Sequence, residues 1–127
     1  MPDFIDFYLA GLIDGDGSIS IIDRHNGGIP YLMVQLSQLD TPEFRALISE
    51  LGRPIWGGDI TTAGRKVSRT AWCGKNAEEL LARIGPCLKL KARQWGLVKE
   101  FLAARVEGDT LRLIMLAEEM KQLNVVT

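Results

Sequence analysis

The sequence predicts one α+β domain over residues 1–127, with an antiparallel sheet that carries helices on one face. Two observations predict this class. Short runs with a period of two, typical of half-buried strands, come in pairs around turn residues, and capped apolar runs with helical spacing separate and follow these pairs. At 46% hydrophobic residues, the chain can bury a core without disulfides. The expected order is helix, hairpin, helix, hairpin, helix, with a further C-terminal helix.

The first half of the chain predicts a helix at 6–13, then a hairpin whose strands are "SISIID" and "YLMVQLSQL". The segment "DTPEFRALISELG" then reads as a helix with its own start and stop signals. Asp40 or Thr41 serves as N-cap, Pro42 lies in the first turn, and Gly52 ends the helix.

The second half repeats the order. Two β-rich runs within 54–73 surround the turn "TAG" and predict a second hairpin. A helix should follow, because Asn76 and Glu79 have the spacing of a capping box before "LLARI". Longer amphipathic helices are expected at 87–106 and 110–123.

Composition excludes several classes of protein. No apolar run approaches the ~20 residues of a membrane-spanning helix, and the start "MPDFIDF" lacks a signal peptide's positive charge. Cys73 and Cys87 lack metal-site spacing and are expected to be reduced. We therefore expect no membrane partner and an intracellular location, in the cytoplasm or an organelle matrix.

Charge is unevenly distributed along the chain. The net charge is −1, which by itself disfavours a nucleic-acid partner. Residues 1–64 hold 3 basic and 9 acidic side chains, however, whereas residues 65–93 hold 8 basic and 2 acidic ones. This basic strip could face DNA or RNA, or it could be an ordinary solvated surface.

Two acids at a helix end break a local rule. Asp14 and Asp16 lie at or just beyond the first helix's C-terminus, where exposed carbonyls disfavour negative charge. A divalent cation would compensate, since it prefers carboxylate and carbonyl oxygens. The alternative is a plain polar turn. Gly11 and Gly15, four residues apart, would let a second helix, such as another subunit's copy, approach closely.

The stretch "LAGLIDGDG", residues 9–17, resembles the LAGLIDADG motif of homing endonucleases at every position except Gly15. The predicted element order is similar to that family's core, and "PCLKLKARQ" resembles the segment that carries its basic catalytic residue. One copy of the motif is present, and single-motif members of the family are homodimers whose motif helices pack at a two-fold axis.

The resemblance implies a function. Such proteins lay a saddle-shaped antiparallel sheet along the major groove of a long, near-palindromic double-stranded DNA target. They hydrolyse both strands across the minor groove and leave 3′ overhangs. The implied cofactor is Mg²⁺ or Mn²⁺, whereas Ca²⁺ supports binding without cleavage.

The resemblance also assigns roles to residues. Asp16 is the implied metal-binding carboxylate, and Gly15 offers a neighbouring carbonyl. Gln38 would orient the water network, and Lys91 would stabilise charge at the scissile phosphate, so Asp16, Gln38 and Lys91 form the expected catalytic set. The dimer contact is expected along the motif helix, at Leu9, Ala10, Gly11, Leu12, Asp14 and Gly15.

Contacts to DNA should come from the strand faces that point away from the helices. Alternation in the first hairpin selects Ser20, Ile22, Arg24, Asn26, Tyr31, Met33, Gln35 and Ser37. The phase of the second hairpin is open, and we expect contacts from Arg65, Lys66 and Arg69 together. Three tryptophans are expected in the core, namely Trp56, Trp72 and Trp95.

Two other functions fit the same scaffold. An RNA maturase would bind its host intron RNA, and a catalytically silent regulator would bind DNA without cutting it. The net acidic balance is unusual for a protein that resembles a basic DNA-binding family. The presence of Asp16, Gln38 and Lys91 together favours the nuclease over the silent regulator.

Overall fold

The computed structural model describes residues 3–24, 28–60 and 64–126. The elements run in the expected order, with a short 3₁₀ turn, η1, added before the fourth helix. They are α1 (Phe4–Asp16), β1 (Gly17–Ile22), β2 (Tyr31–Leu39), α2 (Pro42–Glu50), β3 (Trp56–Ile60), β4 (Lys66–Cys73), α3 (Lys75–Ile84), η1 (Gly85–Cys87), α4 (Ala92–Glu107) and α5 (Thr110–Val126).

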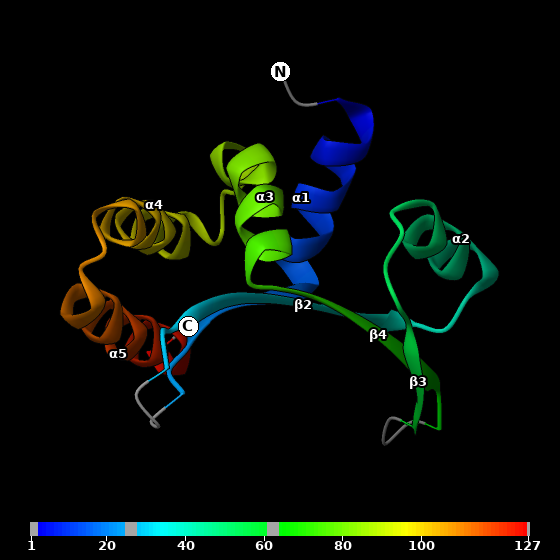
Figure 1. Cartoon of the computed structure of the whole chain (residues 1–127). Helices are drawn as coiled ribbons and strands as arrows, with labels where there is room; N and C mark the ends of the chain where they lie inside the picture. Colours follow the sequence, from blue (N-terminus) through cyan, green and yellow to red (C-terminus); the bar gives the residue numbers. More distant parts are fainter. Residues whose placement is uncertain (1–2, 25–27, 61–63, 127) are drawn as a thin grey trace.

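The four strands form one antiparallel sheet in the order β1-β2-β4-β3. The two predicted hairpins therefore meet through β2 and β4. Figure 1 shows that the sheet is arched, with α1 and α3 above its middle and α2 and α5 toward its two ends. Its concave underside carries no helix among the described residues. This arrangement confirms the α+β class and the helices on one face.

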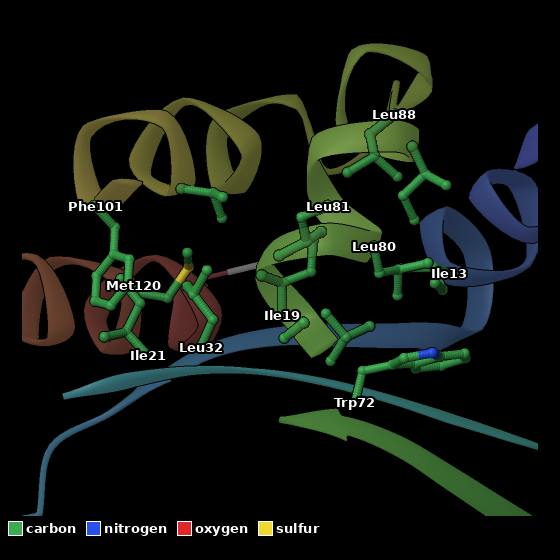
Figure 2. Packing of buried hydrophobic residues seen from close by; sticks show 14 of the residues in the cluster. Ile13, Ile19, Ile21, Leu32, Trp72, Leu80, Leu81, Leu88, Phe101 and Met120 are labelled. Carbon is green, nitrogen blue, oxygen red and sulfur yellow. The ribbon is translucent and has the colours of Figure 1, made fainter. Parts of the chain in front are cut away.

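The core lies between the helices and the convex face of the sheet. Alternation along β1 and β2 buries Ile19, Ile21, Leu32 and Val34 completely or nearly so. Figure 2 shows Ile19, Ile21 and Leu32 meeting apolar side chains from the helices, including Ile13, Leu80, Leu81, Phe101 and Met120. The whole helical layer is thus fixed on one side of the sheet.

Helix α1 is longer than its apolar pattern predicts. At its start, the Asp3 carboxylate accepts the Asp6 backbone N–H at 3.0 Å, while the Asp6 carboxylate accepts that of Asp3. At its end the helix continues through Asp14 to Asp16. Gly17 is needed directly after it, because a Cβ there would lie 2.8 Å from the Cα of Ile13.

Two predictions for the later helices are wrong. The helix expected at 87–106 begins only at Ala92, because residues 88–91 form an irregular segment in which Leu88 is extended. The capping box at Asn76 and Glu79 is not made: α3 begins at Lys75, after Gly74, without a side-chain cap. Gly74 adopts a φ of 58°, which glycine tolerates better than other residues.

Within the described residues, none of the helices combines the length and apolar character needed to cross a membrane.

Candidate functional site

The C-terminal end of α1 is the point where the predicted site residues gather. Asp16 is exposed in the last turn, and its Oδ2 accepts a 2.7 Å hydrogen bond from Nε2 of Gln38. Gln38 lies near the end of β2, 22 residues along the chain. The structure therefore brings together two of the three expected catalytic side chains.

Asp14 is turned toward a different partner. Its Oδ2 accepts the backbone N–H groups of Lys89 at 3.0 Å and Leu90 at 2.9 Å, and its Oδ1 accepts that of Lys91 at 2.8 Å. Burial acts to raise the pKa of Asp14, but these three hydrogen bonds and the positive charge of Lys91 together outweigh it and leave the pKa below its ordinary value. Asp14, which we expected at the dimer contact, thus binds a segment of its own protomer through its carboxylate.

Lys91, the third expected catalytic residue, binds the end of α1 at Asp14. Its Nζ donates a 3.0 Å hydrogen bond to the main-chain oxygen of Asp14. Helix α1 has no basic residue in its last turn. Lys91 supplies the missing cation from a distant segment, where it offsets the negative end of the helix dipole. The negative charge at this helix end, which we expected a metal ion to offset, is therefore offset in part by Lys91.

Donors for a divalent cation are few. Asp16 offers one exposed carboxylate, and a Cβ built on Gly15 would meet nothing within 4 Å, so the helix end there is open. No group of three or more His, Cys, Asp or Glu side chains suited to a metal occurs among the described residues. This donor set fits Mg²⁺, which keeps water and phosphate ligands, better than a cation held wholly by protein.

Asp16 also borders a polar hollow of about 290 Å³ in the open face of the sheet. Strand residues form the rest of its wall, among them the outward-facing Gln35 and Ser37, and Arg69 adds a positive charge. The lining comprises Asp16, Gly17, Ser18, Gln35, Ser37, Arg69 and Thr70. An anionic ligand in this hollow would be attracted by the Arg69 guanidinium and repelled by the Asp16 carboxylate unless a cation lay between them.

The first hairpin presents its predicted outward residues on that face. Ser20 pairs with Met33 and Ile22 pairs with Tyr31, so these side chains point away from the buried isoleucines. Gln35 and Ser37 continue the row along β2, and the Arg24 guanidinium lies 5.0 Å from the centroid of the Tyr31 ring. Asn26 falls outside the described residues.

Register resolves the second hairpin. Arg69 pairs with Ser37 and therefore lies on the outward face, whereas Ser68 pairs with Gln38 on the helix side. Lys66 has the same parity as Ser68, and its Nζ lies 4.0 Å from an Asp40 oxygen. The phase that the sequence left open is thus one in which Arg69 faces outward and Lys66 lies on the opposite side, because residues an odd number apart in a strand point to opposite faces. Arg65 is exposed directly before β4.

The exposed face of α1 differs from the expected dimer contact. Leu9 and Ala10 are 1% and 2% exposed, so their side chains belong to the protomer's own core, and Leu12 is half-buried. Gly11 and Gly15 are open, with no atom within 4 Å of a built Cβ. Three aromatic side chains that sequence reasoning missed share the exposed surface of this helix, namely Phe4, Phe7 and Tyr8. Their helical spacing with Gly11 was the signal that could have found them.

The tryptophans follow the core prediction where they are described. Trp72 is 5% exposed, and Trp95 packs against the core cluster. Gly85 makes room for the Trp95 ring, because a Cβ at that glycine would lie 2.3 Å from a ring carbon. The side chain of Trp56 falls outside the described part of the chain.

Comparison of the sequence with protein-family models and with curated proteins gives no match. The structure, in contrast, is similar to solved homing endonucleases. I-CvuI in complex with its target has a TM-score of 0.65 at 22% identity, over 93% of this chain and 80% of that one. The archaeal intron-encoded I-Vdi141I, complexed with DNA, has a TM-score of 0.65 at 22% identity, over 94% and 84%.

A third structure carries the name of the motif. The LAGLIDADG homing endonuclease I-GzeII, in complex with a DNA target, has a TM-score of 0.63 at 14% identity. The match covers 96% of this chain and 44% of I-GzeII. The class defined by the arched sheet and the helix that ends in acids is therefore the LAGLIDADG homing endonuclease fold. The resemblance indicated by residues 9–17 is confirmed at the level of fold.

Proposed function

We propose that this protein is a site-specific double-strand DNA endonuclease. It acts as a homodimer on a long pseudo-palindromic target, hydrolyses phosphodiesters with Mg²⁺ or Mn²⁺, and leaves 3′ overhangs. One observation carries the proposal: the Asp16 carboxylate at the end of α1 is bound by Gln38 from the end of β2 and borders the open sheet face, while Lys91 binds the same helix end at the Asp14 main chain. The similar solved structures, which are named as homing endonucleases in complex with a target, with DNA or with a DNA target, support the same function.

The open face of the sheet is suited to the major groove, which admits a β-ribbon and displays the groups that distinguish base pairs. Its row of short and long polar side chains offers both donors and acceptors. Arg24, Arg65 and Arg69 would counter backbone phosphates or read guanine edges. Several acids lie away from this row, since Asp14 and Asp6 are bound to their own chain and Asp40 pairs with Arg45. This distribution supports DNA binding despite the net negative charge.

Catalysis would use the residues at the end of α1. Asp16 and the Gly15 carbonyl would hold a divalent cation, which supplies Lewis-acid stabilisation of phosphate and activation of water. Gln38 fixes the Asp16 carboxylate through its amide and would orient the attacking water. Lys91, with its ammonium at the same helix end, would stabilise charge that develops on the phosphate.

The open face of α1 supports the homodimer. Phe4, Phe7 and Tyr8 are 93%, 56% and 60% exposed, which leaves large apolar side chains in water beside two accessible glycines. Two such faces can pack closely, because glycines let helix backbones approach each other. Pairing α1 with its copy would place two Asp16 carboxylates near one two-fold axis, as cutting both strands requires.

Selection from a randomised DNA library tests the proposal. Duplexes are selected for cleavage with Mg²⁺ and, in parallel, for binding with Ca²⁺. Recovered 3′ overhangs inside a near-palindrome are the expected result. Enrichment for binding alone would instead favour a silent regulator, and enrichment for neither would favour intron RNA as the partner. The proposed location is an intracellular compartment that holds DNA.

A further inference from the structure

Asp14 and Lys91 hold each other through a reciprocal contact. The side chain of Asp14 binds the backbone at Lys89, Leu90 and Lys91, and the side chain of Lys91 binds the backbone of Asp14. The two residues are 77 positions apart, so this contact joins two distant segments. The end of α1 and the entry to α4 are thereby fixed relative to each other.

The entry to α4 has little else of its own to order it. Lys91 occupies the N-cap position, but it makes no side-chain capping bond, and the first turn of α4 contains no acid. Leu88, 4% exposed, anchors one side of the segment in the core, while Leu90 is 79% exposed. The Asp14 carboxylate therefore holds residues 89–91 in place through three hydrogen bonds. At most helix starts, a nearby capping residue in the sequence has this role.

Asp14 is also poorly placed to bind a metal. A carboxylate has about four acceptor positions on its two oxygens. Three donors already occupy Asp14, two on Oδ2 and one on Oδ1. Asp16, which accepts from Gln38 and is exposed, keeps more of its oxygen surface available. The two acids of "DGDG" thus have different environments, and these indicate different tasks.

We propose that Asp14 is a positioning residue for Lys91: it fixes the backbone of residues 89–91 so that the Lys91 ammonium stays at the end of α1, on the main-chain oxygen of Asp14. This inference rests on the proposed endonuclease function. It assigns Asp14 to neither the metal nor the dimer contact. Its effect on cleavage should therefore pass through Lys91.

A double-mutant cycle tests that dependence. Single-turnover cleavage at saturating protein and Mg²⁺ is compared for wild type, Asp14→Ala, Lys91→Met and the double variant. We expect each single change to slow cleavage about a hundredfold, because Asp14→Ala would misplace the ammonium by about 1 Å and Lys91→Met would remove its stabilisation of charge. The double variant should be no slower than the slower single one, and DNA affinity in Ca²⁺ should change little.

Two further variants calibrate the cycle. Asp14→Asn keeps one acceptor oxygen and should recover part of the lost rate. Lys89→Met removes the neighbouring exposed lysine, whose backbone alone contacts Asp14, and should stay within about twofold of wild type. Losses that multiply in the double variant, to about ten thousandfold, would overturn the assignment and indicate that Asp14 acts independently of Lys91.

Amide hydrogen exchange supplies a readout that needs no cleavage. In the folded protein, Asp14→Ala should speed exchange at residues 89–91 about tenfold or more, while amides in the buried part of α3 remain protected. Unchanged exchange at these three amides would contradict the positioning role directly. If wild type cuts no DNA, the endonuclease function and the catalytic purpose of the contact both fail, whereas exchange still reports whether Asp14 orders the segment.

Discussion

Gln38 Nε2 lies 2.7 Å from Asp16 Oδ2, and this bond joins the end of β2 to the end of α1. The amide is a neutral donor, so it can orient the carboxylate without cancelling the negative charge that attracts a cation. A lysine in its place would instead form an ion pair and compete with the metal. Gln38 thus orients the Asp16 carboxylate and leaves its negative charge available to a cation.

Gln38→Ala removes that orientation but leaves the carboxylate. We expect Mg²⁺-dependent cleavage to slow by about tenfold to a hundredfold, in the range of a lost positioning or proton-transfer group. The free energy of unfolding should fall by only about 1 kcal/mol or less, because the bond is exposed to water. Single-turnover cleavage and urea titration measure the two effects. A variant with wild-type cleavage would show that Gln38 has no part in the reaction.

Arg69 and Lys66 form a matched pair for testing which face of β4 meets DNA. Arg69→Ala should weaken target binding in Ca²⁺ by about tenfold or more and reduce its salt dependence, because the lost guanidinium lies on the outward face. Lys66→Ala should leave affinity within about twofold, since its side chain lies on the helix side near Asp40. Fluorescence anisotropy at several salt concentrations measures both, and equal losses would contradict the assignment of faces.

Gly11→Leu tests the proposed dimer. The protomer has room for the new side chain, because nothing lies within 4 Å of a Cβ at this position. We therefore expect a folded monomer, as the leucine would force two paired helices apart. Sedimentation equilibrium of wild type and variant gives the oligomeric state, with circular dichroism as the check on folding. A wild type that sediments as a monomer at micromolar concentration would contradict the α1 contact.

Gly17→Ala should destabilise the protein. The added methyl group would lie 2.8 Å from Cα of Ile13 and 3.0 Å from the Gln35 carbonyl oxygen, and these are backbone atoms that cannot move aside cheaply. We expect a loss of about 1–3 kcal/mol in the free energy of unfolding. Gly96→Ala, inside α4 with no atom within 4 Å, is the control and should raise that free energy by about 0.5–1 kcal/mol. Urea titrations of both variants measure these changes. A Gly17→Ala variant as stable as wild type would contradict the predicted clash with the backbone of Ile13.

Local patterns in the sequence were sufficient for much of this structure. The alternation in β1 and β2 predicted which side chains are buried, because one sheet face must meet the core. The caps at Thr41 and Gly52 marked α2 correctly, since both act within a few residues. That Asp16 and Gln38 belong to one site was predicted only from the resemblance of the chain to a family.

Long-range contacts decided the remainder. Residues 88–91 continue a helical pattern in sequence, but Asp14 binds the N–H groups of residues 89–91 and α4 begins later. Which face of β4 points outward, that of Arg69 or that of Lys66, could not be read from the strand alone, because apolar residues occur on both faces and Ala71 and Trp72 are both buried. Phe7 and Tyr8 are large aromatic residues of the kind usually found in a core, and only the packing of α1 shows that they are exposed.

The most direct test of the whole account is cleavage of the selected target by wild type and Asp16→Asn. The account predicts that wild type cuts both strands only when Mg²⁺ or Mn²⁺ is present, and that Asp16→Asn still binds the duplex but cuts it at least about a hundredfold more slowly. Glu50→Gln, an acid-to-amide change at an exposed position in α2, should cut like wild type. Cleavage by Asp16→Asn at the wild-type rate would contradict the assignment of the reaction to the end of α1.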